Sequence, residues 1–373
     1  MSARRSSQAG PAVKRSIAPT LVVFALLASW LTALAQTPAR LFPIVEHDRW
    51  GFMDATGKVV IAPRFEGVDP FHDGLARVVE NGKTVFIDGS GRIVLSPAFD
   101  IVGDFSEGLA TVNFGEVRDR KIGLLEKTGA WGYIDTAGTL ALPLKFTKAG
   151  AFSEGLAAVH EDGRSGFIDR SGKMIFEAPF DVSWGFHEGI VLVKSNLKMA
   201  YFDRTGRRLP TPPLDDNYYG ANFSEGLAAV KIGGRWGYID KTGKLVIPAD
   251  FQEASSFHDG LAAVQSPSDP GPPRTCARPG GSSYTSTRSY GYIDTTGRMV
   301  IPPTAEYAAG FSEGLARVSS CGQASFIDRT GKTVISLPYS EVSSFSGGLA
   351  EVRVGARRGY IDRTGKVVRA PTD

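Results

Sequence analysis

A short phrase that recurs nine times constrains the fold of this chain more than any other feature. In each copy an aromatic residue is followed by a residue that is usually Ile, then by Asp, two further residues and Gly, as in Tyr238-Ile239-Asp240-Lys241-Thr242-Gly243. A second phrase, as in Phe223-Ser224-Glu225-Gly226-Leu227, alternates with it eight times. Successive Asp residues of the first phrase lie 34 residues apart in five of the eight intervals. A fixed internal period of this kind indicates a tandem repeat in which every unit meets the same surroundings.

The first phrase predicts a β-hairpin. Apolar and β-branched residues flank the segment Asp-x-Thr-Gly, which is typical of two strands joined by a short turn. A type I turn followed by a left-handed residue requires Gly, because a Cβ would clash there, and the Asp carboxylate can accept backbone N–H groups of its own turn. The residues predicted to support the turn include Asp54, Asp135, Asp240, Asp294, Gly57, Gly138, Gly243 and Gly297.

The second phrase predicts a third strand, so each unit is expected to be a three-stranded antiparallel meander that buries its apolar face only by stacking on neighbours. The chain then contains about eight and a half units and is all-β. A closed β-propeller is one possible architecture. We predict instead an open twisted array, because both ends of the repeat region supply the same half unit, and two like halves do not complete each other.

The phrases Trp50-Gly51-Phe52-Met53-Asp54, Trp131-Gly132-Tyr133-Ile134-Asp135 and Trp236-Gly237-Tyr238-Ile239-Asp240 resemble the WG repeats, also called KWG repeats, of bacterial proteins. The resemblance covers residues 48–373. It implies an all-β repeat protein and no particular activity. Six units carry another residue at the Trp position, which predicts that this site is only partly buried.

The N-terminus has the pattern of a signal peptide. Four basic residues precede an apolar stretch over residues 21–34, and Ala33 and Ala35 stand where a signal peptidase reads small residues. We predict cleavage after Ala35, a single repeat domain over residues 36–373, and a secreted or periplasmic location with no membrane span after cleavage. An uncleaved anchor is the alternative. Removal of residues 1–35 lowers the formal charge from +3 to −1, which gives no support to nucleic-acid binding.

Two insertions interrupt the period, within residues 116–130 and 265–289, at the same kind of link between units. Insertions in repeat arrays often mark the binding face, although exposed tips also tolerate simple loop growth. A third irregular stretch crowds two acids, an amide and two aromatic side chains that could stack on a sugar or a peptide. These possible ligand contacts are Asp215, Asp216, Asn217, Tyr218 and Tyr219.

The two cysteines, Cys276 and Cys321, fall at corresponding links one unit apart. Stacked units should place such links on one edge, and export would expose the thiols to an oxidising compartment. We therefore predict a disulfide between them, with two separate free thiols as the alternative.

The sequence offers no metal or cofactor site. His72, His187 and His258 lie in units that are not neighbours, and each predicted turn carries a single acid, whereas Ca²⁺ takes six to eight oxygen ligands. No nucleophile elbow, phosphate loop or zinc-protease motif is present.

These observations favour an exported, non-catalytic binding or scaffolding protein of the cell envelope, with a protein or glycan partner. The alternative is a carbohydrate-active enzyme whose site lies in an irregular unit. A binder should present similar residues across several units, whereas an enzyme should concentrate unlike residues in one pocket.

Overall fold

The computed structural model describes residues 40–372 apart from a few short stretches within the links. Those stretches are residues 116, 119–124, 127–128, 217–219, 267–273, 278–282, 288 and 340. All regular secondary structure among the described residues is β, so the prediction of an all-β chain is confirmed. A search of these residues for a helix long and apolar enough to cross a membrane finds none.

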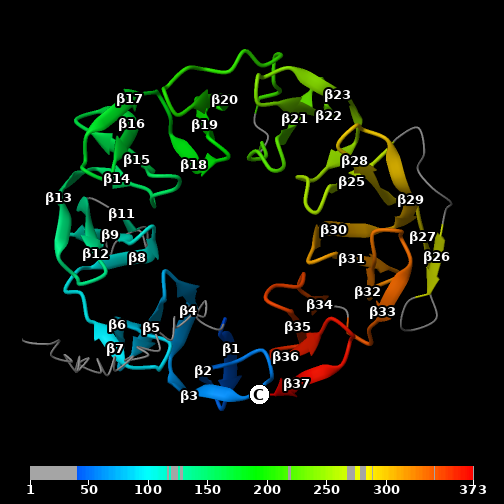
Figure 1. Ribbon diagram of the computed structural model, residues 1–373, viewed down its shortest axis with the longest axis horizontal. Coiled ribbons are helices and arrows are strands. Elements are labelled where there is room, and N and C mark those ends of the chain that lie inside the picture. The colour runs from blue at the N-terminus through cyan, green and yellow to red at the C-terminus, as the bar shows by residue number, and fades with distance from the viewer. Residues whose placement is uncertain are drawn as a thin grey trace, which may run out of the picture. The chain divides into compact units, whose positions relative to one another are not determined.

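The unit formed by residues 38–373 is a closed β-propeller of nine blades, so the prediction of an open array is wrong (Figure 1). Each blade is an antiparallel sheet of three or four strands, here called positions A to D from the centre outward.

The strands of the first five blades are as follows: blade 1, β1 (Phe42–Glu46), β2 (Arg49–Met53), β3 (Val59–Phe65); blade 2, β4 (Gly67–His72), β5 (Leu75–Glu80), β6 (Lys83–Ile87), β7 (Ile93–Leu95); blade 3, β8 (Ile101–Ser106), β9 (Leu109–Phe114), β12 (Ala130–Asp135), β13 (Leu140–Phe146); blade 4, β14 (Lys148–Ala149), β15 (Leu156–Glu161), β16 (Arg164–Asp169), β17 (Met174–Glu177); blade 5, β18 (Val182–His187), β19 (Ile190–Ser195), β20 (Lys198–Asp203).

The remaining blades follow in chain order: blade 6, β21 (Leu227–Ile232), β22 (Arg235–Asp240), β23 (Leu245–Phe251); blade 7, β24 (Glu253–Ala254), β25 (Leu261–Gln265), β28 (Tyr290–Asp294), β29 (Met299–Ala305); blade 8, β30 (Tyr307–Ser312), β31 (Leu315–Ser320), β32 (Gln323–Ile327), β33 (Thr333–Ser336); blade 9, β34 (Glu341–Val342), β35 (Leu349–Val354), β36 (Arg357–Asp362), β37 (Val367–Thr372). Each insertion contains a small separate hairpin, β10 (Val117–Arg118) with β11 (Leu125–Glu126) and β26 (Arg274–Ala277) with β27 (Ser283–Ser286).

The open array was predicted because the boundary of the repeat unit was misplaced. The Gly-Leu strand of each second phrase pairs with the strand of the first phrase that follows it, as Leu227 pairs with Asp240. Each blade therefore starts at a second phrase. Where a blade has an inner strand A, that strand lies just before the second phrase or within it. With this boundary, β36 and β37 complete blade 9, and residues 42–65 supply strands B, C and D of blade 1. Both ends are then accounted for without any half unit.

Aromatic side chains join each blade to the next. The ring of the first phrase, in strand C, packs against the Phe of the second phrase in the following blade. Tyr238 and Phe257 have ring centroids 4.8 Å apart, and Tyr133 and Phe152 have centroids 5.0 Å apart. The hydroxyl of Tyr238 also donates to the carbonyl oxygen of Ser255 in the next blade, at 2.9 Å. The core is therefore a ring of inter-blade clusters and not a set of separate blade cores.

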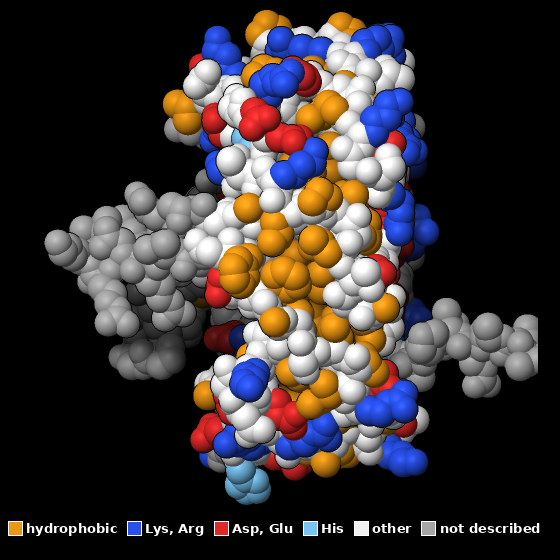
Figure 2. All heavy atoms as spheres, turned by 90° about the vertical axis from the view of Figure 1, so that its left-hand side faces the viewer, with side chains coloured by type: hydrophobic (Ala, Val, Ile, Leu, Met, Phe, Trp, Pro, Cys, Tyr) orange, Lys and Arg blue, Asp and Glu red, His pale blue; other side chains and the backbone are white. Residues whose placement is uncertain are grey.

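The outer strands form the rim of the propeller. Aliphatic residues of these strands remain partly exposed, and Figure 2 shows hydrophobic side chains gathered on the rim. Pro63, Pro143 and Pro248 interrupt β3, β13 and β23, where a missing N–H and a bulge discourage pairing with another chain.

The ring closes by side-chain packing between blades 9 and 1 and without a shared sheet. Phe42 lies with its ring centroid 5.8 Å from that of Tyr360 in an edge-to-face arrangement. The Tyr360 hydroxyl donates to the Pro43 carbonyl oxygen at 2.7 Å, and Arg369 pairs with Glu46. We call this junction the seam. It reproduces the aromatic contact of the other junctions with β1 in place of an inner strand.

Candidate functional site

The nine Asp residues of the first phrase all support hairpin turns. In the turn of Asp240, one carboxylate oxygen accepts the Thr242 hydroxyl at 2.6 Å and the backbone N–H groups of Thr242 at 2.8 Å and Lys244 at 3.2 Å. The hydroxyl of Thr242 is the largest cause that lowers the pKa of this carboxyl group. In the equivalent turn, the Ser90 hydroxyl is the largest cause that lowers the pKa of Asp88 to about 2. The predicted turn glycines have φ values of +89° at Gly57, +82° at Gly138, +87° at Gly243 and +86° at Gly297.

A second set of acids links neighbouring blades. Each of these residues has a positive φ in the turn just before strand B, and its carboxylate accepts the N–H of a Gly in the next blade. Glu225 binds the N–H of Gly260 at 2.9 Å, and Asp73 binds that of Gly108 at 2.7 Å. The full set is Asp73, Glu107, Glu154, Glu188, Glu225, Asp259 and Glu313. These carboxylates stabilise the ring.

The predicted contact stretch lies in the link between blades 5 and 6. Both carboxylate oxygens of Asp215 accept backbone N–H groups, from Gly233 and Gly234 at 2.7 Å each. Glu66 has a similar role at the hairpin turn of blade 2, where its carboxylate accepts the N–H of Gly82. Asp215 therefore clamps a turn, and Asp216 is exposed. Asn217, Tyr218 and Tyr219 lie outside the described residues.

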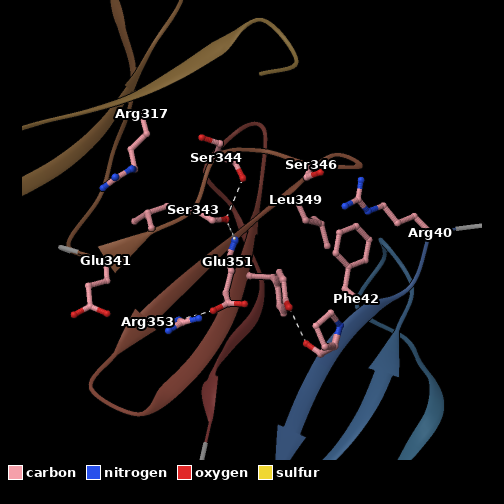
Figure 3. Close-up of a pocket in the computed structure, with 13 residues that line it drawn as sticks. Arg40, Phe42, Arg317, Glu341, Ser343, Ser344, Ser346, Leu349, Glu351 and Arg353 are labelled. Carbon is pink, nitrogen blue, oxygen red and sulfur yellow. Dashed lines mark hydrogen bonds and ion pairs between the residues drawn. The ribbon is translucent and has the colours of Figure 1, made fainter. Parts of the chain in front are cut away.

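The seam holds a hollow of about 490 Å³ that the repeat pattern did not predict. Blade 1 has no strand A, and the lining comes from blades 8, 9 and 1, including Arg317, Ser344, Ser346, Leu349, Arg40 and Phe42. Figure 3 shows Arg317 and Arg40 on opposite sides of the view, with Ser344 and Ser346 between them. This volume lies within the range of small-ligand sites.

Among the described residues, hydrogen bonds that recur between neighbouring blades at other junctions are missing beside this hollow. At the preceding junction the Ser312 hydroxyl donates to the Phe345 carbonyl oxygen, at 2.7 Å. Ser346 occupies the same repeat position, but blade 1 offers no such carbonyl. Gly347 stands where the other blades carry an inter-blade acid, and a Cβ there would lie 2.6 Å from Cδ of Arg40. A side chain at this position would therefore meet Arg40, and Gly347 leaves room for the N-terminal segment.

The charged side chains that line the hollow differ in whether they have an ion-pair partner. The largely buried Glu351 carboxylate binds Arg353 at 2.5 Å and Arg358 at 3.3 Å. By contrast, the guanidinium of Arg317 lies 4.4 Å from the ring centroid of Tyr307 and pairs with no carboxylate among the described residues. The hollow thus combines apolar side chains with an arginine that has no carboxylate partner among the described residues, and the carboxylate of Glu341 also lines it.

Comparison with known sequences identifies the repeat. The family described as "WG containing repeat" matches residues 50–83, 86–116, 131–164, 166–198, 218–236, 236–266, 290–320 and 325–356. The chain belongs to the WG-repeat family. The resemblance found in the sequence is therefore confirmed. A search of curated protein sequences finds no match to this chain.

Solved structures similar to this WG-repeat chain share little of its sequence. A eukaryotic initiation factor structure is 13% identical, with a TM-score of 0.56, and the match covers 88% of this chain and 94% of that one. A structure of apo AztD from Citrobacter koseri is 14% identical, with a TM-score of 0.37 and coverage of 88% and 93%. At this level of identity, the first of these supports the propeller fold alone.

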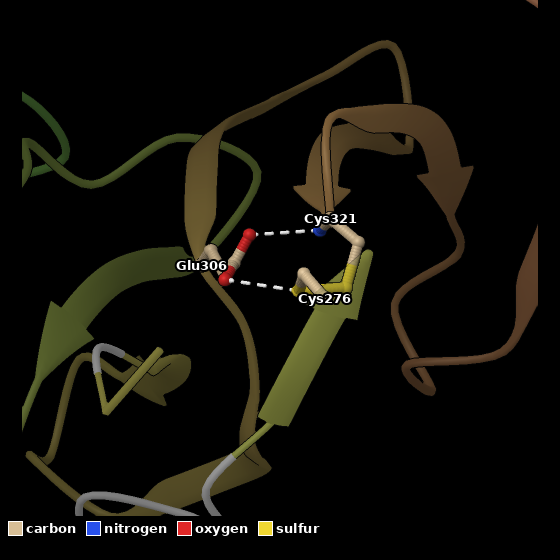
Figure 4. A group of neighbouring side chains, drawn as sticks. All are labelled: Cys276, Glu306 and Cys321. Atoms are coloured by element: carbon tan, nitrogen blue, oxygen red, sulfur yellow. Dashed lines mark hydrogen bonds between the residues drawn. A yellow bond between two sulfur atoms is a disulfide. The ribbon is translucent and has the colours of Figure 1, made fainter. Parts of the chain in front are cut away.

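The predicted disulfide of the WG-repeat chain is present. Cys276 of β26 and Cys321, in the turn after β31, are bonded with their Cα atoms 5.1 Å apart. Figure 4 shows Glu306 beside the pair, and its carboxylate accepts the Cys321 N–H at 2.8 Å. The contact between Glu306 and Cys276 Sγ is not a hydrogen bond, because a disulfide sulfur carries no hydrogen. The bond ties the second insertion to blade 8.

Replacing both cysteines with serine is expected to lower the free energy of unfolding by about 3–4 kcal/mol, because the 45-residue separation leaves a large loop open in the unfolded chain. Denaturant unfolding of the oxidised wild type and the double variant measures the difference. Digestion of the purified protein without reductant, followed by mass spectrometry, should yield the linked peptides. Alkylation of both thiols in that protein would contradict the pairing.

Calcium is expected to bind the WG-repeat chain no more tightly than about 10⁻⁴ M, the weak end of protein calcium sites. The turn carboxylates already accept several hydrogen bonds, as Asp240 does. Among the described residues, the one cluster with metal-ligand geometry is Cys276, Glu306 and Cys321, and its sulfurs are in the disulfide. Calorimetric titration is the measurement, with Asp240→Asn as a control that should give the same trace. Several micromolar sites would show that the turn acids are ligands.

Proposed function

We propose that this protein is an exported, non-catalytic binding scaffold of the cell envelope, and that the hollow at the seam is where its protein or glycan partner is held. The observation that carries the proposal is the interruption of the ring at one junction. Elsewhere the repeated acids are engaged with backbone N–H groups, whereas the seam gathers unlike side chains around a hollow of about 490 Å³.

Two features support export. Residues 1–35 have the charge and hydrophobicity pattern of a signal peptide. A disulfide between the only two cysteines is typical of proteins in oxidising compartments. Expression of the full chain in a bacterium, followed by fractionation and N-terminal sequencing, tests this part. A mature chain that starts at Gln36 outside the cytoplasm is expected, and a full-length cytoplasmic chain would contradict export.

The engagement of the acids supports a non-catalytic role. General acid–base catalysis by carboxyl groups needs a pair placed around a substrate, often with one raised pKa. The Asp residues of the hairpin turns for which a shift is resolved have lowered pKa values, as in Asp88 and Asp240. Recovery of bound ligand in unaltered form is expected, and its hydrolysis would favour the carbohydrate-active alternative.

Binding at the hollow is tested with arrays of glycans and peptides and the exported protein. Ser344→Trp should fill the hollow and reduce binding of the best ligand at least about tenfold, the effect of losing about 1.4 kcal/mol. Ser256→Trp is the matched control, because Ser256 precedes Phe257 in blade 7 as Ser344 precedes Phe345 in blade 9. Equal binding by both variants would place the partner elsewhere on the ring.

A further inference from the structure

We infer that Arg317 binds the carboxylate group of an organic ligand in the hollow; this names the ligand chemistry of the binding site proposed above and rests on that proposal. The inference comes from a comparison of two blades of the same molecule.

Blade 2 shows what an arginine at this repeat position binds. Arg77 is the third residue of β5, as Arg317 is the third residue of β31. The Nε of Arg77 lies 3.0 Å from the Asp69 carboxylate and 3.1 Å from that of Asp104 in the next blade, and its Nη1 donates to the Val102 carbonyl oxygen at 2.7 Å. The planar guanidinium group suits such carboxylate pairing.

Blade 8 keeps the arginine and loses both acids. Counted from the Phe of the second phrase, Ala309 stands at the position of Asp69, and Ser344 stands at that of Asp104. Arg317 lies instead over the ring of Tyr307, a residue that replaces Gly67. The position that carries a carboxylate beside Arg77 therefore carries a hydroxyl beside Arg317, at the edge of the hollow.

The surroundings of Arg317 suit the carboxylate of an incoming molecule. The Ser344 hydroxyl has no partner among the described residues and can donate to the same carboxylate. The Ser343 hydroxyl is already engaged, since it accepts the Glu351 N–H at 2.9 Å and donates to the Ser344 carbonyl oxygen. Val342, Leu349 and Phe42 line the hollow with buried apolar surface for the rest of the ligand.

The test is calorimetric titration of the exported protein with two sources of carboxylate. Succinate is the free acid, with succinamide as its neutral control, and a short peptide with a free C-terminus is compared with its amidated form. Binding of at least one acid, with at least about tenfold weaker binding of its amide, is expected, because a hydrogen bond to a charged group contributes about 1.5–3 kcal/mol. The better of the two acids identifies the source.

The variants assign the effect to Arg317. Arg317→Gln should weaken acid binding about tenfold or more, and Arg317→Lys should retain part of it. Ser344→Asp restores an internal carboxylate like that of Asp104 and should also weaken acid binding. Ser256→Asp is the matched control, because the facing residue in blade 6 is Ala229 and not an arginine, and it should leave binding unchanged. Melting curves check that each variant is folded, and Ser344→Asp decides the matter if Arg317→Gln unfolds.

The outcomes separate this inference from the proposed function. Absence of acid binding, equal binding of acids and amides, or unchanged binding by Arg317→Gln and Ser344→Asp would each overturn the carboxylate assignment. If the array ligand is still lost in Ser344→Trp, the binding function stands with a different ligand chemistry. If Ser344→Trp leaves the binding of both the acid and the array ligand unchanged, the hollow is not the site and both proposals fall.

Discussion

Gly237→Val is expected to destabilise the protein by about 3 kcal/mol or more, the upper range for overfilling a packed site. Between Trp236 and Tyr238 the pairing of β22 with β23 skips from Phe251 to Ile247, so the outer strand bulges across Gly237. A Cβ there would lie 2.6 Å from the Ile247 carbonyl oxygen and 2.8 Å from the Ala249 nitrogen. Backbone atoms on this side cannot move aside as a flexible side chain would.

Two comparisons sharpen this experiment. Gly243→Val, at a turn with a φ of +87°, should cost about 1–3 kcal/mol. Ser325→Val occupies the position of Gly237 in blade 8, where no register shift lies between Ser325 and Phe326, and should change stability by less than about 0.5 kcal/mol. Denaturant unfolding of the three variants measures which substitution lowers the free energy of unfolding most. Equal stability of Gly237→Val and Ser325→Val would show that the bulge does not require glycine.

Phe42→Ala should lower the free energy of unfolding by about 3–5 kcal/mol, the usual cost of truncating a buried Phe. Phe42 is 5% exposed and packs with Ile44, Met53, Leu349 and Tyr360 at the seam. Because the chain does not cross the junction between blades 9 and 1, this cluster carries much of the ring closure.

Unfolding curves measure the loss of stability in Phe42→Ala, and small-angle scattering measures whether the ring opens. Phe257→Ala, at a junction that the chain itself crosses, is the control, and it should lose similar stability without opening the ring. Tyr360→Phe removes one hydrogen bond, to Pro43, and should cost only about 1 kcal/mol. A loss below 1 kcal/mol for Phe42→Ala, with unchanged scattering, would show that closure depends on other contacts.

Much of this fold could be predicted from the sequence because its determinants are local. The Asp-x-Thr-Gly turn sets each outer hairpin through bonds within five residues, as at Asp240. The disulfide could also be predicted, because Cys276 and Cys321 fall at equivalent links of adjacent blades. Partial burial of the Trp position holds for Trp50 and Trp236, whereas Trp131 is only 9% exposed.

Closure could not be predicted from the same local rules. It depends on contacts between residues more than 300 positions apart, such as Tyr360 and Pro43. Two signals were nevertheless present. Leu41 stands as far before Asp54 as Leu75 stands before Asp88, which marks residues 41–46 as a degenerate second phrase. Gly347 replaces the acid that the other seven second phrases carry, which marks the junction where no inter-blade carboxylate is needed.

The site was missed for a related reason. In the sequence, Arg317 is an ordinary strand residue. Its role as a candidate ligand contact can be inferred only when Ala309 and Ser344 are compared with Asp69 and Asp104. Asp215 attracted attention because acids and aromatic residues crowd around it, but its carboxylate serves a hairpin turn. Crowding in sequence therefore identified a structural residue, and the loss of partners at one repeat position identified the candidate ligand contact.

The seam also determines how the ring responds to mechanical tension. Both ends of the described chain lie at this junction, so a pull on the two termini acts across it directly (Figure 1). The other eight junctions are crossed by the chain, whereas the contacts at the seam are between side chains or between a side chain and the backbone. They include the Phe42–Tyr360 ring contact, the Tyr360 hydrogen bond, the Arg369–Glu46 pair, the Arg358 guanidinium over the Trp50 ring and apolar packing. Under load we expect the ring to open at the seam first, because the chain itself holds the two blades together at every other junction.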